Sequence, residues 1–203
     1  ADAYTAKYGN PFSKKFKAGD LRYVDVNGDG DLTADNREYC GSPDPKYTFG
    51  LNIFTAWRNF DLALSFNGAT GAKILFDAYE VYGSFSGDAS HPSTIWRDAW
   101  TETNHNAKMP RIHYGTESPS SSRQAASDFW LQDTSYLRLK NLQLGYTLPK
   151  SILNSLGVTN VRVYYSAENV FTFDKMKINI DPEATSQRLS SYPLLRSHAF
   201  GIN

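Results

Sequence analysis

The sequence is short of cysteine, of methionine and of net charge. Its 203 residues include one Cys and two Met, and 21 basic residues balance 21 acidic ones. Cys40 stands alone and cannot form an internal disulfide, so a disulfide-linked scaffold is excluded. A balanced charge supplies no long-range field for nucleic acid, which we therefore do not expect as a partner.

Long apolar runs are missing as well. No stretch approaches ~20 consecutive apolar residues, which excludes a transmembrane helix in this sequence. Membrane-spanning strands carry a weaker signal of ~10 alternating residues, and they are not excluded. Aromatic residues, by contrast, are frequent, with 13 Tyr, 12 Phe and 4 Trp among the 203 residues.

Apolar and small or polar side chains alternate from residue 47 onward. Tyr47, Phe49, Leu51, Ile53 and Trp57 share one face, interrupted by Thr55. The pattern stops at Arg58-Asn59 and resumes with Phe60, Leu62, Leu64 and Phe66. Two alternating runs joined by two residues predict a tight β-hairpin.

Three further stretches alternate in the same way: "SYLRLKNLQLGYTLP", "NVRVYYSAENVFTF" and "RSHAFGIN". The first changes phase near Leu139–Lys140, which predicts a β-bulge or the exit of the strand from an apolar zone. Pro149 ends that strand. Earlier in the sequence, within the long loop at 82–132, "STIWRDAWTE" is typical of a short helical turn. The sequence therefore predicts an all-β fold of about five strands.

The connections between these segments sort by length. Short turns fall at 58–59 and 149–159, and long loops at 1–46, 82–132 and 174–193. Because short and long connections alternate, both short turns are expected at one end of an antiparallel sheet. Outer-membrane barrels have this arrangement, and aromatic residues near strand ends fit an interfacial girdle. A soluble β-sandwich shows the same alternation of faces and stays open on periodicity alone.

The stretch "DVNGDGDL" at residues 25–32 fits the first half of a calcium-binding loop. Aspartate and asparagine oxygens occupy loop positions 1, 3 and 5, Gly30 occupies position 6, and Asn36 stands at position 12, where the template has a bidentate Glu. A solvated turn is the alternative, because Asn-Gly and Asp-Gly pairs form turns without metal. The expected structural calcium would be held by Asp25, Asn27, Asp29, Asp31 and Asp35.

No catalytic motif stands out. "GSFSG" has Phe85 where a nucleophile elbow has Ser, and the four histidines lack metal-ligand spacing. Asp181 and Glu183 belong to a long loop and are interpreted as solvated or loop-fixing. Three loop tryptophans are candidate contacts for a sugar ligand, with loop packing or a partner interface as alternatives: Trp96, Trp100 and Trp130.

Several blocks resemble the C-terminal part of TonB-dependent outer-membrane transporters of the SusC/RagA type. They are "GDLRYVDVNGDGDL", "GSPDPKYTFGLN", "NFDLALSFNGATG", "WTETNHNAKMPRI", "SYLRLKNLQLGYTLPKSIL", "NVRVYYSAENVFTF" and "AFGIN". The resemblance implies a 22-strand antiparallel transmembrane β-barrel, of which 47–203 would supply the last five or so strands and 1–46 an extracellular loop. The sequence lacks the family's plug and N-terminal energy-coupling segment and stops before the expected aromatic terminus, so a fragment is expected.

The resemblance also implies a function and partners. We expect part of a non-enzymatic importer of oligosaccharides or peptides in the outer membrane of a Gram-negative, Bacteroidetes-type cell. It would work with a SusD-like surface lipoprotein and with TonB, the latter through the absent N-terminal part. The competing hypothesis is a secreted, calcium-stabilised β-sheet module that binds carbohydrate or protein.

On the importer hypothesis, the two faces of each strand meet different surroundings. The small and polar residues would face the lumen or plug: Asn141, Gln143, Arg162, Ser166 and Glu168. The large apolar residues would face outer-membrane lipid: Trp57, Leu62, Leu64, Leu142, Leu144, Val163 and Phe200.

Overall fold

The computed structural model describes most of the chain, in several stretches: residues 2–9, 16–75, 84–85, 94–114, 127–177, 180–183, 192 and 194–203. The chain divides into two compact units. The first, here the loop unit, comprises Ala1–Gly41, Ile74–Gln132 and Thr185–Ser190. The second, here the sheet unit, comprises Ser42–Lys73, Asp133–Ala184 and Ser191–Asn203.

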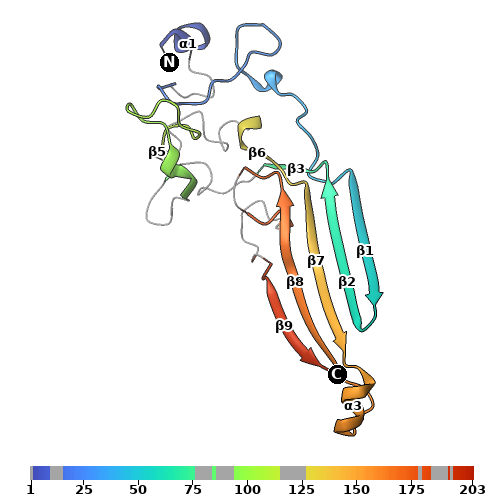
Figure 1. Cartoon of the computed structure of the whole chain (residues 1–203). Helices are drawn as coiled ribbons and strands as arrows, with labels where there is room; N and C mark the ends of the chain where they lie inside the picture. The colour runs from blue at the N-terminus through green and yellow to red at the C-terminus, as the bar shows by residue number, and fades with distance from the viewer. Residues whose placement is uncertain are drawn as a thin grey trace. The chain divides into compact units, whose positions relative to one another are not determined.

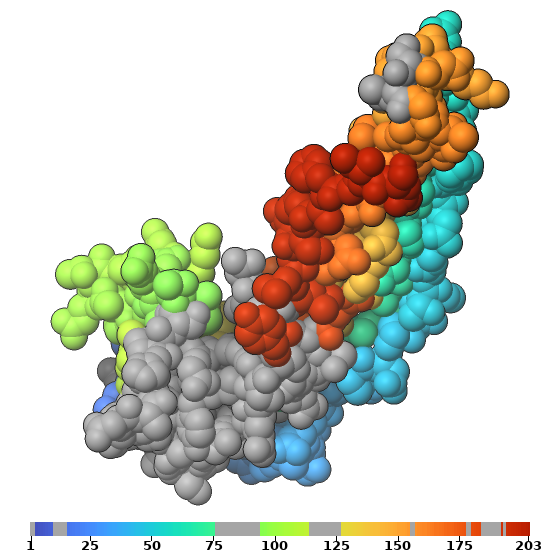
Figure 2. Space-filling view, turned by 90° about the horizontal axis from the view of Figure 1, so that it is seen from below, coloured from blue at the N-terminus to red at the C-terminus, as the bar shows by residue number. Residues whose placement is uncertain are grey.

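A five-stranded antiparallel sheet makes up the sheet unit. Its strands, in spatial order, are β1 (Tyr47–Trp57), β2 (Phe60–Thr70), β7 (Tyr136–Thr147), β8 (Arg162–Asp174) and β9 (Ser197–Ile202). Figure 1 shows them as one layer, and Figure 2 shows the same strands side by side from red β9 to cyan β1. The sequence prediction of an all-β, antiparallel fold with about five strands is confirmed.

The short connections lie at one end of this sheet. Arg58 begins the two-residue turn between β1 and β2 with a φ of +53°, and the carbonyl of Asn59 accepts a 2.8 Å hydrogen bond from the Thr147 amide. After β7, Pro149 leads into α3 (Lys150–Leu156), which ends at Gly157 with a φ of +68°. The strand pairing places this turn and α3 at the same end, as expected from the sorting of the connections (Figure 1).

The predicted phase change in β7 is a β-bulge. The pairing of β2 with β7 shifts between Leu139 and Asn141, which leaves Lys140 as the extra residue. The pairing of β7 with β8 shifts at the same level, where Asn169 of β8 has a φ of +51°. Bulges increase local twist and reorient the side chains that follow. They explain why alternation in the sequence fails at one point although both faces continue.

The loop unit holds short elements around its own aromatic core. It contains α1 (Asp2–Tyr8), η2 (Ala34–Asn36), η4 (Thr94–Asp98), η5 (Asp128–Trp130), and the parallel pair β4 (Ser84–Phe85) and β5 (His113–Tyr114). β3 (Lys73–Leu75) pairs with β6 (Leu131–Asp133) in a second small sheet. The predicted helical turn is confirmed by η4. Residues 1–46 contain α1 where the sequence predicts loop, because Tyr4 packs on Phe16 at 4.7 Å between ring centroids and its hydroxyl donates to the Tyr23 carbonyl.

Among the described residues, no helix is long and apolar enough to cross a membrane.

Candidate functional site

One face of the sheet unit is apolar and exposed. The register brings Leu62 opposite Leu144 and Leu64 opposite Leu142, and it continues through Tyr165 to β9. All the residues predicted to meet lipid lie on this face: Trp57, Leu62, Leu64, Leu142, Leu144, Val163 and Phe200. Phe200 is 83% exposed, Trp57 68% and Leu144 44%. Their contact with lipid stays a prediction.

The opposite face is polar and built from small side chains. Asn141 pairs with Glu168 and Gln143 pairs with Ser166 across β7 and β8. All five residues predicted to face the lumen lie here: Asn141, Gln143, Arg162, Ser166 and Glu168. Phe54 of the edge strand β1 is an exception, a large apolar side chain that is 73% exposed on this face. The two faces therefore differ in chemistry along the whole sheet.

An ion pair crosses the polar face near the short-turn end. The Arg162 guanidinium on β8 donates to both carboxylate oxygens of Asp61 on β2, at 2.9 and 2.5 Å. β7 runs between these two strands, and Gly145 stands where a side chain would block the pair. Arg162 also lies 5.3 Å from the ring centroid of Tyr164. Sequence reasoning found Arg162 but missed Asp61, because the two residues are 101 positions apart.

A second ionic cluster occupies the polar face near the opposite end of the sheet. Arg138 of β7 pairs with Asp181 and Glu183, which follow β8 in the sequence. Burial alone would raise the pKa of Asp181, but hydrogen bonds from Arg138 and the Glu183 amide, with the Arg138 charge, hold this pKa below its ordinary value. The pKa of Glu183 is likewise lowered, because Tyr136, Arg138 and Lys140 together outweigh burial. Both carboxyl groups are therefore ionised at neutral pH.

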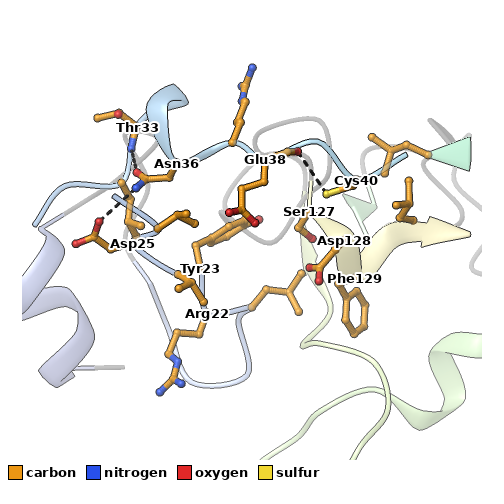
Figure 3. Close-up of a pocket in the computed structure, with 17 residues that line it drawn as sticks. Arg22, Tyr23, Asp25, Thr33, Asn36, Glu38, Cys40, Ser127, Asp128 and Phe129 are labelled. Carbon is orange, nitrogen blue, oxygen red and sulfur yellow. Dashed lines mark hydrogen bonds between the residues drawn. The ribbon is translucent and has the colours of Figure 1, made fainter. Parts of the chain in front are cut away.

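The calcium-like loop is closed by its own hydrogen bonds. Asp25 accepts from the amides of Gly28 and Gly30, at 2.8 and 3.0 Å. Asn36 donates from Nδ2 to Asp25 Oδ1 at 3.3 Å, while its own Oδ1 accepts from the Thr33 amide (Figure 3). Its Nδ2 also donates to Asn27 Oδ1 at 3.0 Å. The side chain at loop position 12 thus points a nitrogen toward the predicted ligands.

This geometry fits calcium only in part. Asp25, Asn27 and Asp29 carry the kind of oxygens that calcium binds, and these oxygens accept hydrogen bonds from N–H groups of the loop. Asp31 and Asp35 are exposed, and Asn36 rather than Asp35 reaches the other ligands. Within the described ranges, no cluster of three or more His, Cys, Asp or Glu is arranged to hold a metal. A calcium clip stays a prediction.

A cavity of about 870 Å³ lies in the loop unit beside this loop. Tyr23, Glu38, Ser127, Asp128 and Phe129 are among its lining residues (Figure 3). Burial raises the pKa of Tyr23, so its phenol is neutral at physiological pH. The cavity mixes apolar walls with hydroxyl and carboxylate groups, and its lining includes Asp25, a predicted calcium ligand, but none of the three candidate tryptophans.

The structure separates the three candidate tryptophans. Trp96 and Trp130 are 4% and 2% exposed, and their ring centroids lie 6.1 Å apart in the core of the loop unit. Buried rings offer no face to a sugar, so these two residues pack the loop unit, which confirms the loop-packing alternative for them and not the ligand-contact prediction. Trp100 is half-buried and stacks on His105 at 5.6 Å between centroids. Its ligand role stays a prediction.

No family model matches the chain, but individual proteins do. TonB-dependent receptor P3 of Formosa agariphila is 33% identical over 194 residues, which are 89% of this chain and 18% of that protein. TonB-dependent receptor SusC of Bacteroides thetaiotaomicron is 23% identical over 199 residues, covering 97% of this chain and 18% of SusC.

Solved structures give the same result. The RagAB peptide importer in the 'closed-closed' state matches with a TM-score of 0.63 and 27% identity, over 88% of this chain and 20% of that chain. A structure of the RagAB peptide transporter matches with a TM-score of 0.64 and 26% identity, over 89% and 20%. The chain thus spans about a fifth of the length of the proteins it matches.

Proposed function

We propose that this chain forms part of the wall of an energy-coupled outer-membrane importer. It belongs to the SusC/RagA type of TonB-dependent receptors. The sheet unit would span the outer membrane, with its apolar face toward lipid and its polar face toward the lumen. The chain's own residues would supply a surface for passage rather than catalytic chemistry. The matched RagAB structures are those of a peptide importer and transporter, and the matched sequences are TonB-dependent receptors, which supports this role.

The observation that carries the proposal is the exposed apolar face. Burying apolar surface is worth about 25 cal/mol per Å², so a soluble protein gains by covering side chains such as Phe200, Ile202 and Trp57. These residues are 83%, 74% and 68% exposed in the described sheet, while charged groups are paired on its other face. Contact with the hydrocarbon core of a membrane accounts for this exposure, because apolar side chains are more stable in hydrocarbon than in water.

The edges of the sheet support the same proposal. In the described chain, β1 and β9 each pair on one side only. Unpaired edges cannot stand in hydrocarbon, where each backbone polar group needs a partner. Five strands are also fewer than the ~8 that close a barrel. Further strands of a longer protein would pair with both edges, and the expected total from the family resemblance is 22.

The finer assignments follow from the same resemblance. The imported solute would be an oligosaccharide or a peptide, captured with a SusD-like surface lipoprotein, and TonB would supply the energy through another part of the protein. The long connections would then lie outside the cell, together with the calcium-like loop at Asp25–Asn36. A secreted β-sheet module is the competing function, and that loop is the observation in its favour.

A charge inserted on each face tests the proposal. In the full-length protein, Leu144→Arg places a charge on the apolar face and should cost about 2–4 kcal/mol and block barrel assembly. Gln143→Arg, one residue earlier on the polar face, is the matched control and should assemble normally. Heat-modifiable migration of the outer-membrane fraction on gels measures assembly.

Equal behaviour of these two variants would contradict the proposal. So would a stable, detergent-free monomer of the 203-residue chain, because an apolar face this exposed would then have a soluble explanation. The secreted module requires that second result, so the two functions are separated by one preparation.

A further inference from the structure

Arg138 is a buried cation on the polar face of the sheet. Its side chain is 2% exposed. Among the described residues that form ion pairs, only Asp20 is less exposed. A guanidinium removed from water is costly unless charges and hydrogen-bond acceptors surround it. The partners of Arg138 therefore decide whether this position is stable.

Those partners come from a separate part of the chain. Arg138 Nη2 lies 2.6 Å from Asp181 Oδ1, and Nη1 lies 2.5 Å from Glu183 Oε2. The third nitrogen, Nε, donates to Thr172 Oγ1 at 2.9 Å. The two carboxylates follow Arg138 by 43 and 45 residues, in the described segment 180–183.

Glu183 is held by more than one strand. Its Oε1 accepts from the Tyr136 hydroxyl at 2.8 Å and from Asn67 Nδ2 at 3.3 Å, and its Oε2 lies 3.4 Å from Lys140 Nζ. The Glu183 amide donates to Asp181 Oδ1 at 2.9 Å, which ties the two acidic residues to each other. Pro182, between them, is buried.

The strand register fixes the direction of this contact. Asn67 of β2, Arg138 of β7 and Thr172 of β8 are paired neighbours across the sheet, on the polar face. Segment 180–183 therefore contacts β2 and β7 on the polar side, while Thr172 of β8 holds the Arg138 side chain from the other side. The chain after β8 turns back over this face instead of continuing away from it.

We propose that Arg138 is a positioning residue that holds segment 180–183 against the polar face, an arrangement here called the clamp. The held segment narrows the passage through which a solute moves along this face. The clamp stands on the contacts of Arg138, Asp181 and Glu183. Its effect on passage rests on the proposed function, because that function makes the polar face the lumen side. Lys140, whose side chain is 37% exposed, also pairs with Glu183 and lies at the solvent-facing margin of the clamp.

Hydrogen exchange of the full-length protein in detergent tests the clamp. Arg138→Met should raise exchange in segment 180–183 about tenfold or more, because two carboxylates lose their charge partner. Glu183→Gln should raise it less, and Arg138→Met with Glu183→Gln should add little to Arg138→Met, because both remove the same contact. Arg138→Lys, which keeps the charge without the fork, should restore part of the protection.

Asp61→Asn is the matched control, because it breaks the other ion pair of the same face and should leave residues 180–183 protected. Unchanged exchange in Arg138→Met, or an equal increase in Asp61→Asn, would overturn the clamp. If Arg138→Met does not fold, exchange in Glu183→Gln tests the clamp instead. This variant is expected to fold, because the side-chain amide of the new glutamine still accepts and donates hydrogen bonds.

A second measurement separates the clamp from the proposed function. In a Cys40→Ser background, Ile180→Cys in the membrane should react with a water-soluble maleimide, and faster when Arg138→Met is added, while Leu144→Cys should stay unreactive. Equal reaction of Ile180→Cys and Leu144→Cys would contradict the proposed function and leave the exchange result standing. Protection of Ile180→Cys that Arg138→Met does not change would overturn the clamp.

Discussion

The carboxylates of the sheet unit and those of the calcium-like loop find partners at very different distances along the chain. Asp61 pairs with Arg162, 101 residues away, and Arg138 pairs with Glu183, 45 residues away. Asp25, in contrast, accepts from donors 3, 5 and 11 residues away. The sheet thus joins distant segments through charge, while the loop is stabilised locally.

This difference matters for what each region can withstand. An exposed, local network exchanges with water and contributes little to the whole protein. A cross-strand pair on a half-buried face also fixes strand order and register, because it forms only when its strands are correctly aligned. We therefore expect the sheet pairs to be the more costly to break, and the following substitutions test this.

The largest effect is expected at Gly145. Gly145→Ala puts a methyl group against the ends of the Arg162 and Asp61 side chains, so the two groups must move and their ion pair weakens, which should lower the midpoint of denaturant unfolding. Gly50→Ala is the control on the same face, because its added methyl meets only ordinary contacts. Denaturant unfolding of the full-length protein measures both. If Gly145→Ala costs the same with Asp61→Ala already present, the ion pair is not the reason.

A smaller effect is expected from acid at the Arg138 clamp. Because the folded pKa values of Asp181 and Glu183 are lowered, their contribution is complete above the ordinary carboxyl pKa of about 4 and is lost as pH falls through the folded values. The loss should be about 0.5–1 kcal/mol after solvent screening. Exchange protection of residues 180–183 at decreasing pH measures it. Asp181→Asn with Glu183→Gln should remove this pH dependence, and a clamp that persists unchanged at pH 2 would contradict the assignment.

The smallest effect on the whole chain is expected from calcium. Adding Ca²⁺ should slow hydrogen exchange in residues 25–36 and leave β7 and β8 unchanged, since the loop is exposed and local. Asp25→Ala should abolish the response. Asn36→Glu should strengthen it, because it restores a carboxylate at loop position 12. A response that survives Asp25→Ala, or no response in Asn36→Glu, would leave the loop as a plain turn.

Much of the sheet was predictable because a strand has a period of two. The alternation of Leu62, Leu64, Leu142 and Leu144 identified one face, and the Arg58-Asn59 pair identified the turn. The bulge was visible as a change of phase at Lys140. These features depend on neighbouring residues, so the sequence carries them directly.

The candidate sites were less predictable. Nothing in the sequence near Asp61 indicates that it pairs with Arg162. Arg138 is buried only because the chain after β8 brings Asp181 and Glu183 next to it. Trp96 and Trp130 stand in sequence stretches that resemble exposed loops, yet their rings pack together. A loop sequence lacks the periodicity that reports burial, so exposure could not be assigned to either ring.

The sequence alone determined the strands, their two faces and the loop with its row of carboxylates, because each follows from spacing over a few residues. Only the tertiary structure decided which charges meet, since ion pairs between residues 43 to 101 positions apart depend on strand order and register. It also decided that the apolar side of the described sheet stays uncovered, because exposure depends on what packs against a face, and spacing within a strand does not contain that information.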